Sequence, residues 1–181
     1  GIIGNNGAGK STLLKVLCGI MMPSSGKVLV DEEMASFFDI SSAIVPELTG
    51  KENIYILGKF QGLSSSEIKE IYPVIAEFSE LDDFLDTPVK YYSSGMVMRL
   101  AFSVMIHAVK KIFLFDEVFS VGDILFQAKC HKMLYKLKNE GCSMILVSHN
   151  LNELATLCDR IILMDKGKFI ASGNWEDLIK P

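Results

Sequence analysis

The chain has 181 residues, of which 49% are hydrophobic and 22% are charged. This composition excludes disordered, low-complexity and collagen-like classes, and the length is typical of one large domain. The 18 basic and 22 acidic side chains give a net charge of −4, which argues against binding nucleic acid or an anionic membrane through bulk charge but leaves a local anion site open.

Strand and helix signals alternate over the first 45 residues. Residues 1–3 are typical of the end of a buried strand, and they lead through a glycine-rich turn into an apolar helix predicted over 10–18. A Pro-Ser-Ser-Gly turn at 23–26 then precedes a predicted short strand over 27–31 and extended pieces around 34–45.

Helical signals dominate from about residue 50 to about residue 110. Thr49 with Glu52, and Ser64 with Glu67, form two capping boxes, and such boxes mark the starts of helices. The predicted helices cover residues 52–60, 66–78 and 94–109. This pattern indicates a helical insert between strands.

Alternation returns after residue 110. The predicted strands cover 112–115, 143–147, 160–164 and 168–172, and the predicted helices cover 123–140 and 150–158. Strands that alternate with helices favour an α/β sheet with right-handed crossovers. We therefore expect one domain over residues 1–181, with a core of 1–49 and 111–181 around the insert at about 50–110.

Cysteine usage and hydropathy favour a cytosolic setting. The four cysteines show no CxxC spacing and are too sparse for a disulfide framework. The longest nearly apolar stretch, 100–109, is shorter than the roughly 18 residues that a membrane-spanning helix needs. We expect no transmembrane segment, and no targeting peptide is visible in this sequence.

The strongest motif is GNNGAGKS at residues 4–11, which matches the phosphate-binding loop pattern between a strand and a helix. Glycines let backbone N–H groups turn inward around a phosphate, and the following helix contributes its positive end. Lys10 would reach the β- and γ-phosphates, and Ser11 would bind Mg²⁺ through its hydroxyl. The nucleotide-binding residues predicted here are Gly4, Asn5, Asn6, Gly7, Ala8, Gly9, Lys10, Ser11 and Thr12.

A second motif is the run IFLFDE at residues 112–117, in which a buried strand ends in two acids. A carboxylate at the carboxyl edge of a parallel sheet lies beside the loop that holds the phosphates. Asp116 would hold Mg²⁺ through water, and Glu117 would orient or deprotonate the attacking water. Taken alone, the pair would be an acidic helix start.

With the segment YSSGM at residues 92–96, the sequence resembles the ATP-binding cassette family. Members of that family carry an LSGGQ-like turn at this point, which holds the γ-phosphate of a nucleotide bound to the opposite subunit. The resemblance assigns the serine role to Ser93 and the second-glycine role to Gly95, with Ser94 between them. Tyr92, Ser94 and Met96 depart from the commonest pattern.

The resemblance implies roles for two more residues. His149 follows a predicted strand and matches the family's switch histidine, which contacts the γ-phosphate. We therefore count His149 as catalytic, together with Lys10 and Glu117. Asp123 in SVGD resembles the aspartate loop that crosses the dimer interface. The family's usual glutamine before the insert is absent from residues 37–54.

The resemblance implies a P-loop NTPase fold with a parallel central sheet and an inserted helical subdomain, lacking its usual N-terminal strands. It also implies ATP and Mg²⁺ as cofactors, a head-to-tail homodimer through the nucleotide sites, and an integral membrane permease as partner. The segments PELTGKENIYILG and DEVFSVGDILFQAKC resemble the subgroup that exports polysaccharide, teichoic acid or O-antigen. Such a subunit lies at the cytoplasmic face of the bacterial inner membrane.

Two other functions remain open from the sequence. One is a soluble, non-transport ATPase of the same family, as in translation factors or DNA repair, although such proteins usually carry two cassettes or a long coiled coil. The other is a small-molecule kinase, which would share residues 4–11 but has no use for YSSGM.

Overall fold

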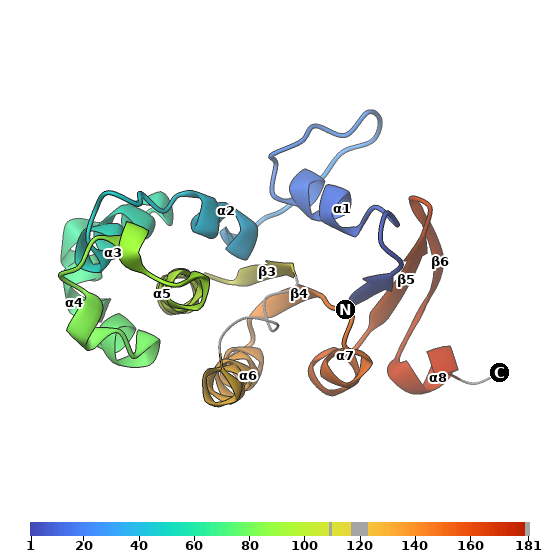
Figure 1. Cartoon of the computed structure of the whole chain (residues 1–181). Coiled ribbons are helices and arrows are strands. Elements are labelled where there is room, and N and C mark those ends of the chain that lie inside the picture. The colour runs from blue at the N-terminus through green and yellow to red at the C-terminus, as the bar shows by residue number, and fades with distance from the viewer. Residues whose placement is uncertain (109, 117–122, 180–181) are drawn as a thin grey trace. The chain divides into compact units, whose positions relative to one another are not determined.

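The computed structural model describes residues 1–108, 110–116 and 123–179, and the chain divides into two units (Figure 1). Unit 1 comprises Gly1–Met34, Lys111–Phe119 and Leu134–Pro181. Unit 2 comprises Ala35–Lys110 and Ser120–Met133. Each unit carries some of the residues singled out in the sequence, so each is described by itself.

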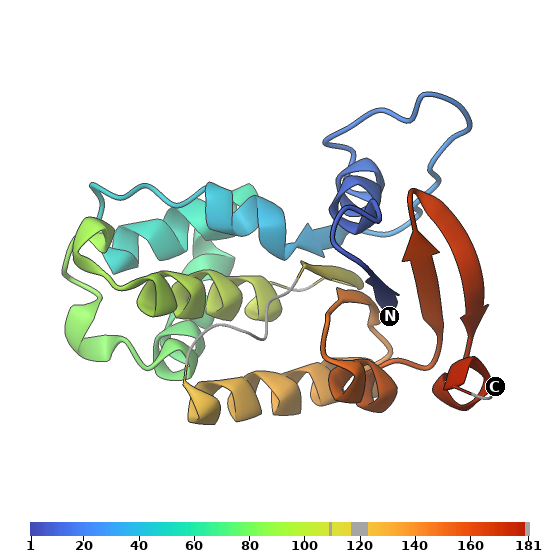
Figure 2. The same ribbon diagram turned by 45° about the vertical axis from the view of Figure 1, so that its right-hand side comes forward.

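Unit 1 is built on a mostly parallel sheet. Its strands are β1 (Ile2–Gly4), β3 (Ile112–Asp116), β4 (Ser143–Val147), β5 (Ile161–Asp165) and β6 (Lys168–Gly173). They lie in the order β3-β4-β1-β5-β6, and only β6 is antiparallel to its neighbour, with which it forms a hairpin (Figure 2). The expected α/β fold with a mainly parallel sheet is confirmed.

The strand register aligns the carboxyl ends of the central strands of unit 1. Val147 at the end of β4 lies opposite Ile2 on one side and Asp116 on the other. Ile2 also lies opposite Ile162 of β5. The segments that follow β1, β3 and β4 therefore leave the sheet at the same edge.

Helices cover both faces of this sheet. The α1 helix (Lys10–Leu17) and the α7 helix (Leu151–Leu157) lie on opposite faces (Figure 1). Between the strands and α1, the buried side chains of Ile2, Leu14, Leu114, Val147 and Met164 form one core cluster. A short α8 helix (Trp175–Ile179), which the sequence did not predict, follows β6.

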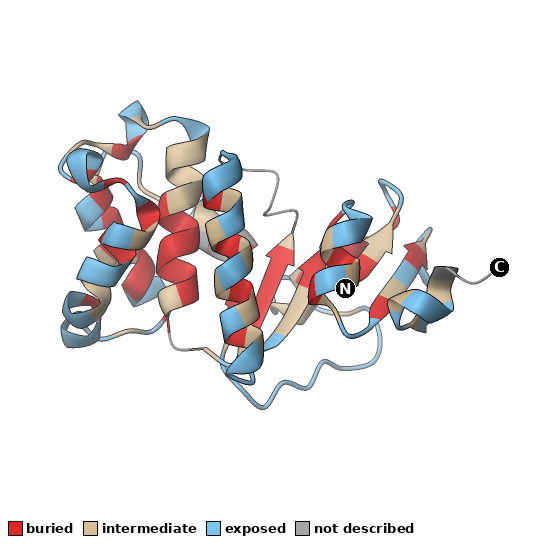
Figure 3. Ribbon diagram, turned by 90° about the horizontal axis from the view of Figure 1, so that it is seen from below, coloured by how far each residue is buried: buried red, intermediate tan, exposed pale blue. Residues whose placement is uncertain are grey.

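Unit 2 is mainly helical and includes residues 50–110. Its elements are α2 (Phe37–Ser42), α3 (Gly50–Phe60), α4 (Ser65–Ser79), the 3₁₀ turns η1 (Asp82–Phe84) and η2 (Val89–Tyr91), and α5 (Ser94–His107). The α6 helix (Ile124–Asn139) starts in unit 2 and ends in unit 1. All of 100–106 in α5 is buried, as the red stretch of this helix shows (Figure 3). This segment is covered on all sides, which agrees with its largely apolar sequence.

Both capping boxes form as predicted. The Thr49 hydroxyl accepts from the Glu52 N–H at 3.2 Å, and the Glu52 carboxylate accepts from the Thr49 N–H at 2.8 Å. Ser64 and Glu67 repeat the arrangement. Hydrogen bonds from Thr49 lower the pKa of Glu52, and those from Ser64 lower the pKa of Glu67. These boxes begin α3 and α4 at Gly50 and Ser65.

Two predictions for residues 27–45 are wrong. Residues 27–31 form no strand, because no described strand pairs with them, and Val28, Leu29 and Val30 stay exposed. The extended pieces predicted around 34–45 reduce to the three-residue β2 (Met34–Ser36), which runs directly into α2. Intrinsic strand propensity produces a strand only where a neighbour supplies backbone partners.

Within the described ranges, no helix combines the length and apolarity that crossing a bilayer requires.

Asn53 of α3 holds the segment that precedes the helix. Its side chain is fully buried, its amide N–H groups donate to the carbonyls of Val45 (3.0 Å), Leu48 (3.1 Å) and Thr49 (2.9 Å), and its Oδ1 accepts from the Val45 N–H at 2.8 Å. One side chain thus satisfies several buried backbone groups.

We expect Asn53→Ala to lower the free energy of unfolding by about 3 kcal/mol, because several buried backbone groups would lose their partner. Denaturant unfolding of the full chain measures this loss. Asn152→Ala, at an exposed position of α7, is the matched control and should change stability by less than about 0.5 kcal/mol. Equal effects of the two substitutions would contradict the role given to Asn53.

Candidate functional site

The loop at residues 4–11 leaves the carboxyl edge of the sheet of unit 1. It joins the end of β1 to the start of α1, and a turn closed by the Ala8 N–H and the Asn5 carbonyl (3.0 Å) shapes it. Gly7 and Gly9 have φ angles of 80° and 95°, which favour glycine. No side chain caps α1 at Gly9, so the N–H groups of its first turn suit an anion.

Lys10 is the most informative residue of the loop. Its side chain is buried, with 6% exposure, and its Nζ donates to the carbonyls of Gly4 (2.7 Å) and Asn5 (3.2 Å). Among the described residues no carboxylate pairs with it. A buried ammonium compensated only by carbonyl dipoles has capacity for an anion. The loop therefore fits phosphate groups, with Ser11 and Thr12 exposed beside them.

Gly4 is required by close packing. A Cβ at this position would overlap the carbonyl oxygen of Met164 on the paired strand β5. We expect Gly4→Ala to lower the free energy of unfolding by about 1–3 kcal/mol and to weaken nucleotide binding, because the β1 end and its loop must shift. Thermal unfolding and nucleotide titration measure both effects.

Gly173→Ala is the matched control for Gly4→Ala. It lies in β6, and its Cβ would make only ordinary contacts of at least 3.4 Å, with Asp177 and Leu178. A Gly4→Ala chain as stable as Gly173→Ala would contradict the packing constraint.

The predicted acidic pair is placed only in part. Asp116 is the last residue of β3, half-buried, and level with Val147 in the register. It therefore lies at the same edge as the loop at 4–11, where it could hold a divalent cation with Ser11. Glu117 lies outside the described residues.

His149 stands in a tightly held turn between β4 and α7, and it is exposed. The buried Ser148 hydroxyl donates to Glu153 at 2.7 Å and accepts from the Asn150 N–H at 3.0 Å. Asn150 caps α7 and donates to Glu153 at 3.1 Å. The structure thus brings the loop at 4–11, Asp116 and His149 to neighbouring strand ends of unit 1.

The polar frame around His149 was missed by sequence reasoning. An N-cap residue followed three positions later by glutamate, as Asn150 is by Glu153, is a visible capping signal that could have found it.

The other predicted site residues belong to unit 2. Ser93 is the N-cap of α5 and accepts from the Met96 N–H at 3.2 Å, and Ser94 and Gly95 open the helix. This turn borders an open hollow of about 510 Å³, which is also lined by the residues after α4, by Arg99 and by Asp123. The positive end of the α5 dipole lies at this wall of the hollow and favours an anion there.

Asp123 lies at the start of α6. One carboxylate oxygen accepts from the Phe126 N–H at 2.9 Å, and the other pairs with the Arg99 guanidinium. The hydrogen bond from the Phe126 N–H is the largest cause that lowers the pKa of Asp123. Desolvation opposes it, and the nearby Arg99 charge lowers the pKa by a lesser amount. Sequence reasoning missed Arg99, although it is the lone charged residue among the apolar side chains of 94–106.

Comparison with known proteins finds a family and close relatives. The ABC transporter family model matches residues 1–120. The chain is 42% identical to the ABC transporter protein AbcA of Aeromonas salmonicida, over 96% of this chain and 56% of AbcA. It is 40% identical to the O-antigen export system ATP-binding protein RfbB of Klebsiella pneumoniae, over 99% and 73%. It is 38% identical to the teichoic acids export ATP-binding protein TagH of Listeria monocytogenes, over 98% and 53%.

Solved structures share the fold. The ATP-binding subunit of an ABC transporter superposes with a TM-score of 0.85 and 25% identity, over 98% of this chain and 78% of that one. A dimeric ATP-binding cassette in a post-hydrolysis state with ADP and Pi has a TM-score of 0.82 and 22% identity, over 96% and 83%. The second likeness supports the fold alone. This chain spans only about half the length of AbcA and TagH.

Proposed function

The chain belongs to the ABC transporter family, and from this premise we propose that it is the ATP-hydrolysing subunit of an exporter of polysaccharide, teichoic acid or O-antigen. The observation that carries the ATP site is the buried Lys10 in the loop at 4–11, a cation with two carbonyl partners and no described carboxylate. Three phosphate groups would supply the missing negative charge.

Each residue at the edge of unit 1 has a role in this proposal. The N–H groups of the loop and Lys10 bind and neutralise the β- and γ-phosphates. Ser11 and Asp116 would hold Mg²⁺, which would neutralise part of the phosphate charge. Glu117 accepts a proton from the attacking water, and His149 contacts the γ-phosphate from the turn after β4.

We further propose that unit 2 provides the second half of the nucleotide site. In this proposal unit 1 is the catalytic core, and unit 2 contains the inserted helical subdomain. Two chains would associate head to tail, so that the N-terminus of α5 at Ser93, Ser94 and Gly95 meets the γ-phosphate held by the other chain. The open hollow beside this turn supports the proposal, because the positive end of the α5 dipole lies at its wall.

Export is supported by the relatives. RfbB and TagH are named as ATP-binding proteins of O-antigen and teichoic acid export systems. By analogy the partner is an integral membrane permease, and the subunit lies against the cytoplasmic face of the bacterial inner membrane. Closing and reopening of the dimer would drive that permease.

One experiment tests the proposal in two steps. ATP hydrolysis by the purified chain is measured with and without Mg²⁺, and the chain is then used to co-purify membrane proteins from its host. The proposal expects Mg²⁺-dependent release of phosphate and recovery of a multi-span permease. Hydrolysis without a permease would favour a soluble ATPase of the same family. Phosphate transfer to a small molecule would favour a kinase and overturn the proposal.

A further inference from the structure

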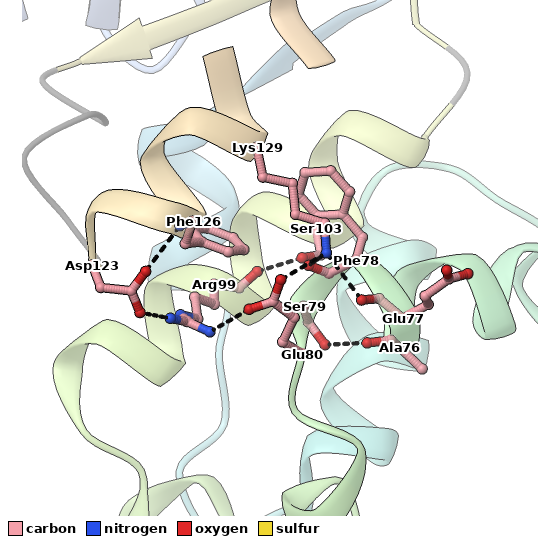
Figure 4. Close-up of polar contacts among 10 residues, drawn as sticks. All are labelled: Ala76, Glu77, Phe78, Ser79, Glu80, Arg99, Ser103, Asp123, Phe126 and Lys129. Atoms are coloured by element: carbon pink, nitrogen blue, oxygen red, sulfur yellow. Dashed lines mark hydrogen bonds and ion pairs between the residues drawn. The ribbon is translucent and has the colours of Figure 1, made fainter. Parts of the chain in front are cut away.

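Arg99 lies where three elements of unit 2 meet (Figure 4). It comes from α5, and one guanidinium nitrogen donates to Glu80 at the end of α4 at 3.1 Å. A second nitrogen of the same guanidinium pairs with Asp123 at the start of α6. The group also stacks on the ring of Phe126, with its central carbon 4.7 Å from the ring centre.

Burial makes these contacts more than a surface ion pair. The side chain of Arg99 is only 16% exposed, whereas those of Glu80 and Asp123 are 48% and 57% exposed. A guanidinium held between two carboxylates and an aromatic face has little freedom, because its planar fork matches both partners at once. A lysine offers one point charge and cannot bridge both acids in this way.

Glu80 has an unusual backbone conformation and two ion-pair partners. It ends α4 in the left-handed conformation, with φ 57° and ψ 38°, which glycine normally favours. Its second carboxylate oxygen binds Lys129 at 3.0 Å, so both oxygens are engaged. These two ion pairs connect the end of α4 to α5 and to α6.

The bridge also shapes the hollow beside the turn at 92–96. Glu80, Arg99 and Asp123 all line that hollow, together with Ser93 and Gly95. Arg99, which comes from α5, therefore connects two other residues that line the hollow, Glu80 at the end of α4 and Asp123 at the start of α6.

We propose that Arg99 is a positioning residue, which holds Asp123 and the end of α4 beside the turn at 92–96 and so keeps the hollow in the shape that receives the nucleotide of a second chain. The positioning follows from the contacts above. Its consequence for the nucleotide rests on the proposed function.

The test compares Arg99→Gln, Arg99→Lys and the control Lys129→Gln in the full chain. Lys129 contacts the same Glu80 and the carbonyls of Glu77 and Phe78, but it touches neither Asp123 nor the hollow. Two quantities are measured. They are amide hydrogen exchange at 124–127 without nucleotide, and association with the slowly hydrolysed analogue ATPγS by analytical ultracentrifugation.

We expect Arg99→Gln to speed exchange at 124–127 and to weaken ATPγS-driven association about tenfold, with unchanged affinity of the single chain for ATPγS. Arg99→Lys should restore part of both. Lys129→Gln, which releases the end of α4 but leaves Asp123 held by Arg99, should change both less than Arg99→Gln does. In an Asp123→Asn background, Arg99→Gln should add a smaller loss than it causes in the wild type, because only its ion pair with Glu80 then remains to be lost.

Unchanged exchange in Arg99→Gln, or an equal loss in Lys129→Gln, would overturn the inference. A wild-type chain that fails to associate with ATPγS would instead contradict the proposed dimer. In that case the exchange data, which need no nucleotide, still decide whether Arg99 positions Asp123.

Discussion

Replacing Lys10 with alanine is expected to weaken ATP binding by about 100-fold. The ammonium is already desolvated in the loop, and it donates only to the carbonyls of Gly4 and Asn5. Charge-assisted hydrogen bonds to phosphate contribute about 1.5–3 kcal/mol each, and about 1.4 kcal/mol corresponds to a factor of ten. Calorimetric titration of ATP with Mg²⁺ measures the change.

Lys15→Ala is the matched control, because it removes the same charge from the last turn of α1, away from the loop. We expect it to leave the ATP affinity within about twofold, since salt screens the charge of the half-buried Lys15 from a site at the other end of α1. If both substitutions lowered affinity equally, the loss would reflect the net charge of α1, and Lys10 would have no special contact with phosphate.

Glu117→Gln is expected to keep ATP binding and to reduce the turnover number by about 10²–10⁴-fold, the range that general-base catalysis supplies. The amide can still lie beside the attacking water but cannot accept its proton. Equilibrium ATP affinity and steady-state phosphate release separate the two effects, because a group that acts only in the transition state changes turnover and not binding.

Glu176→Gln, on the short α8 helix, is the control for the loss of one carboxylate from unit 1. Its turnover should equal that of the wild type. If Glu117→Gln kept the wild-type turnover number, Glu117 would not be the catalytic base, and another group would have to accept the proton.

Local patterns predicted several elements correctly because their causes are local. The capping boxes at Thr49 and Ser64 are short-range hydrogen bonds, and they begin α3 and α4 as expected. The apolar run in 112–116 becomes β3, buried between neighbours as its composition indicates. The prediction of a strand at 27–31 was wrong because these residues have no described partner strand, and their apolar side chains stay exposed. A local sequence pattern does not reveal whether a partner strand is present.

The sequence by itself determined the candidate phosphate loop, since the glycine spacing and Lys10 of residues 4–11 describe a binding surface made mostly of local backbone. It also placed Asp116 and His149 after strands, and so at one edge of a parallel sheet. Only the tertiary structure revealed the bridge from Arg99 to Glu80 and Asp123, which lie 19 and 24 residues away along the chain. Such contacts depend on how three helices pack, and packing sums many weak interactions between distant residues that no short motif encodes.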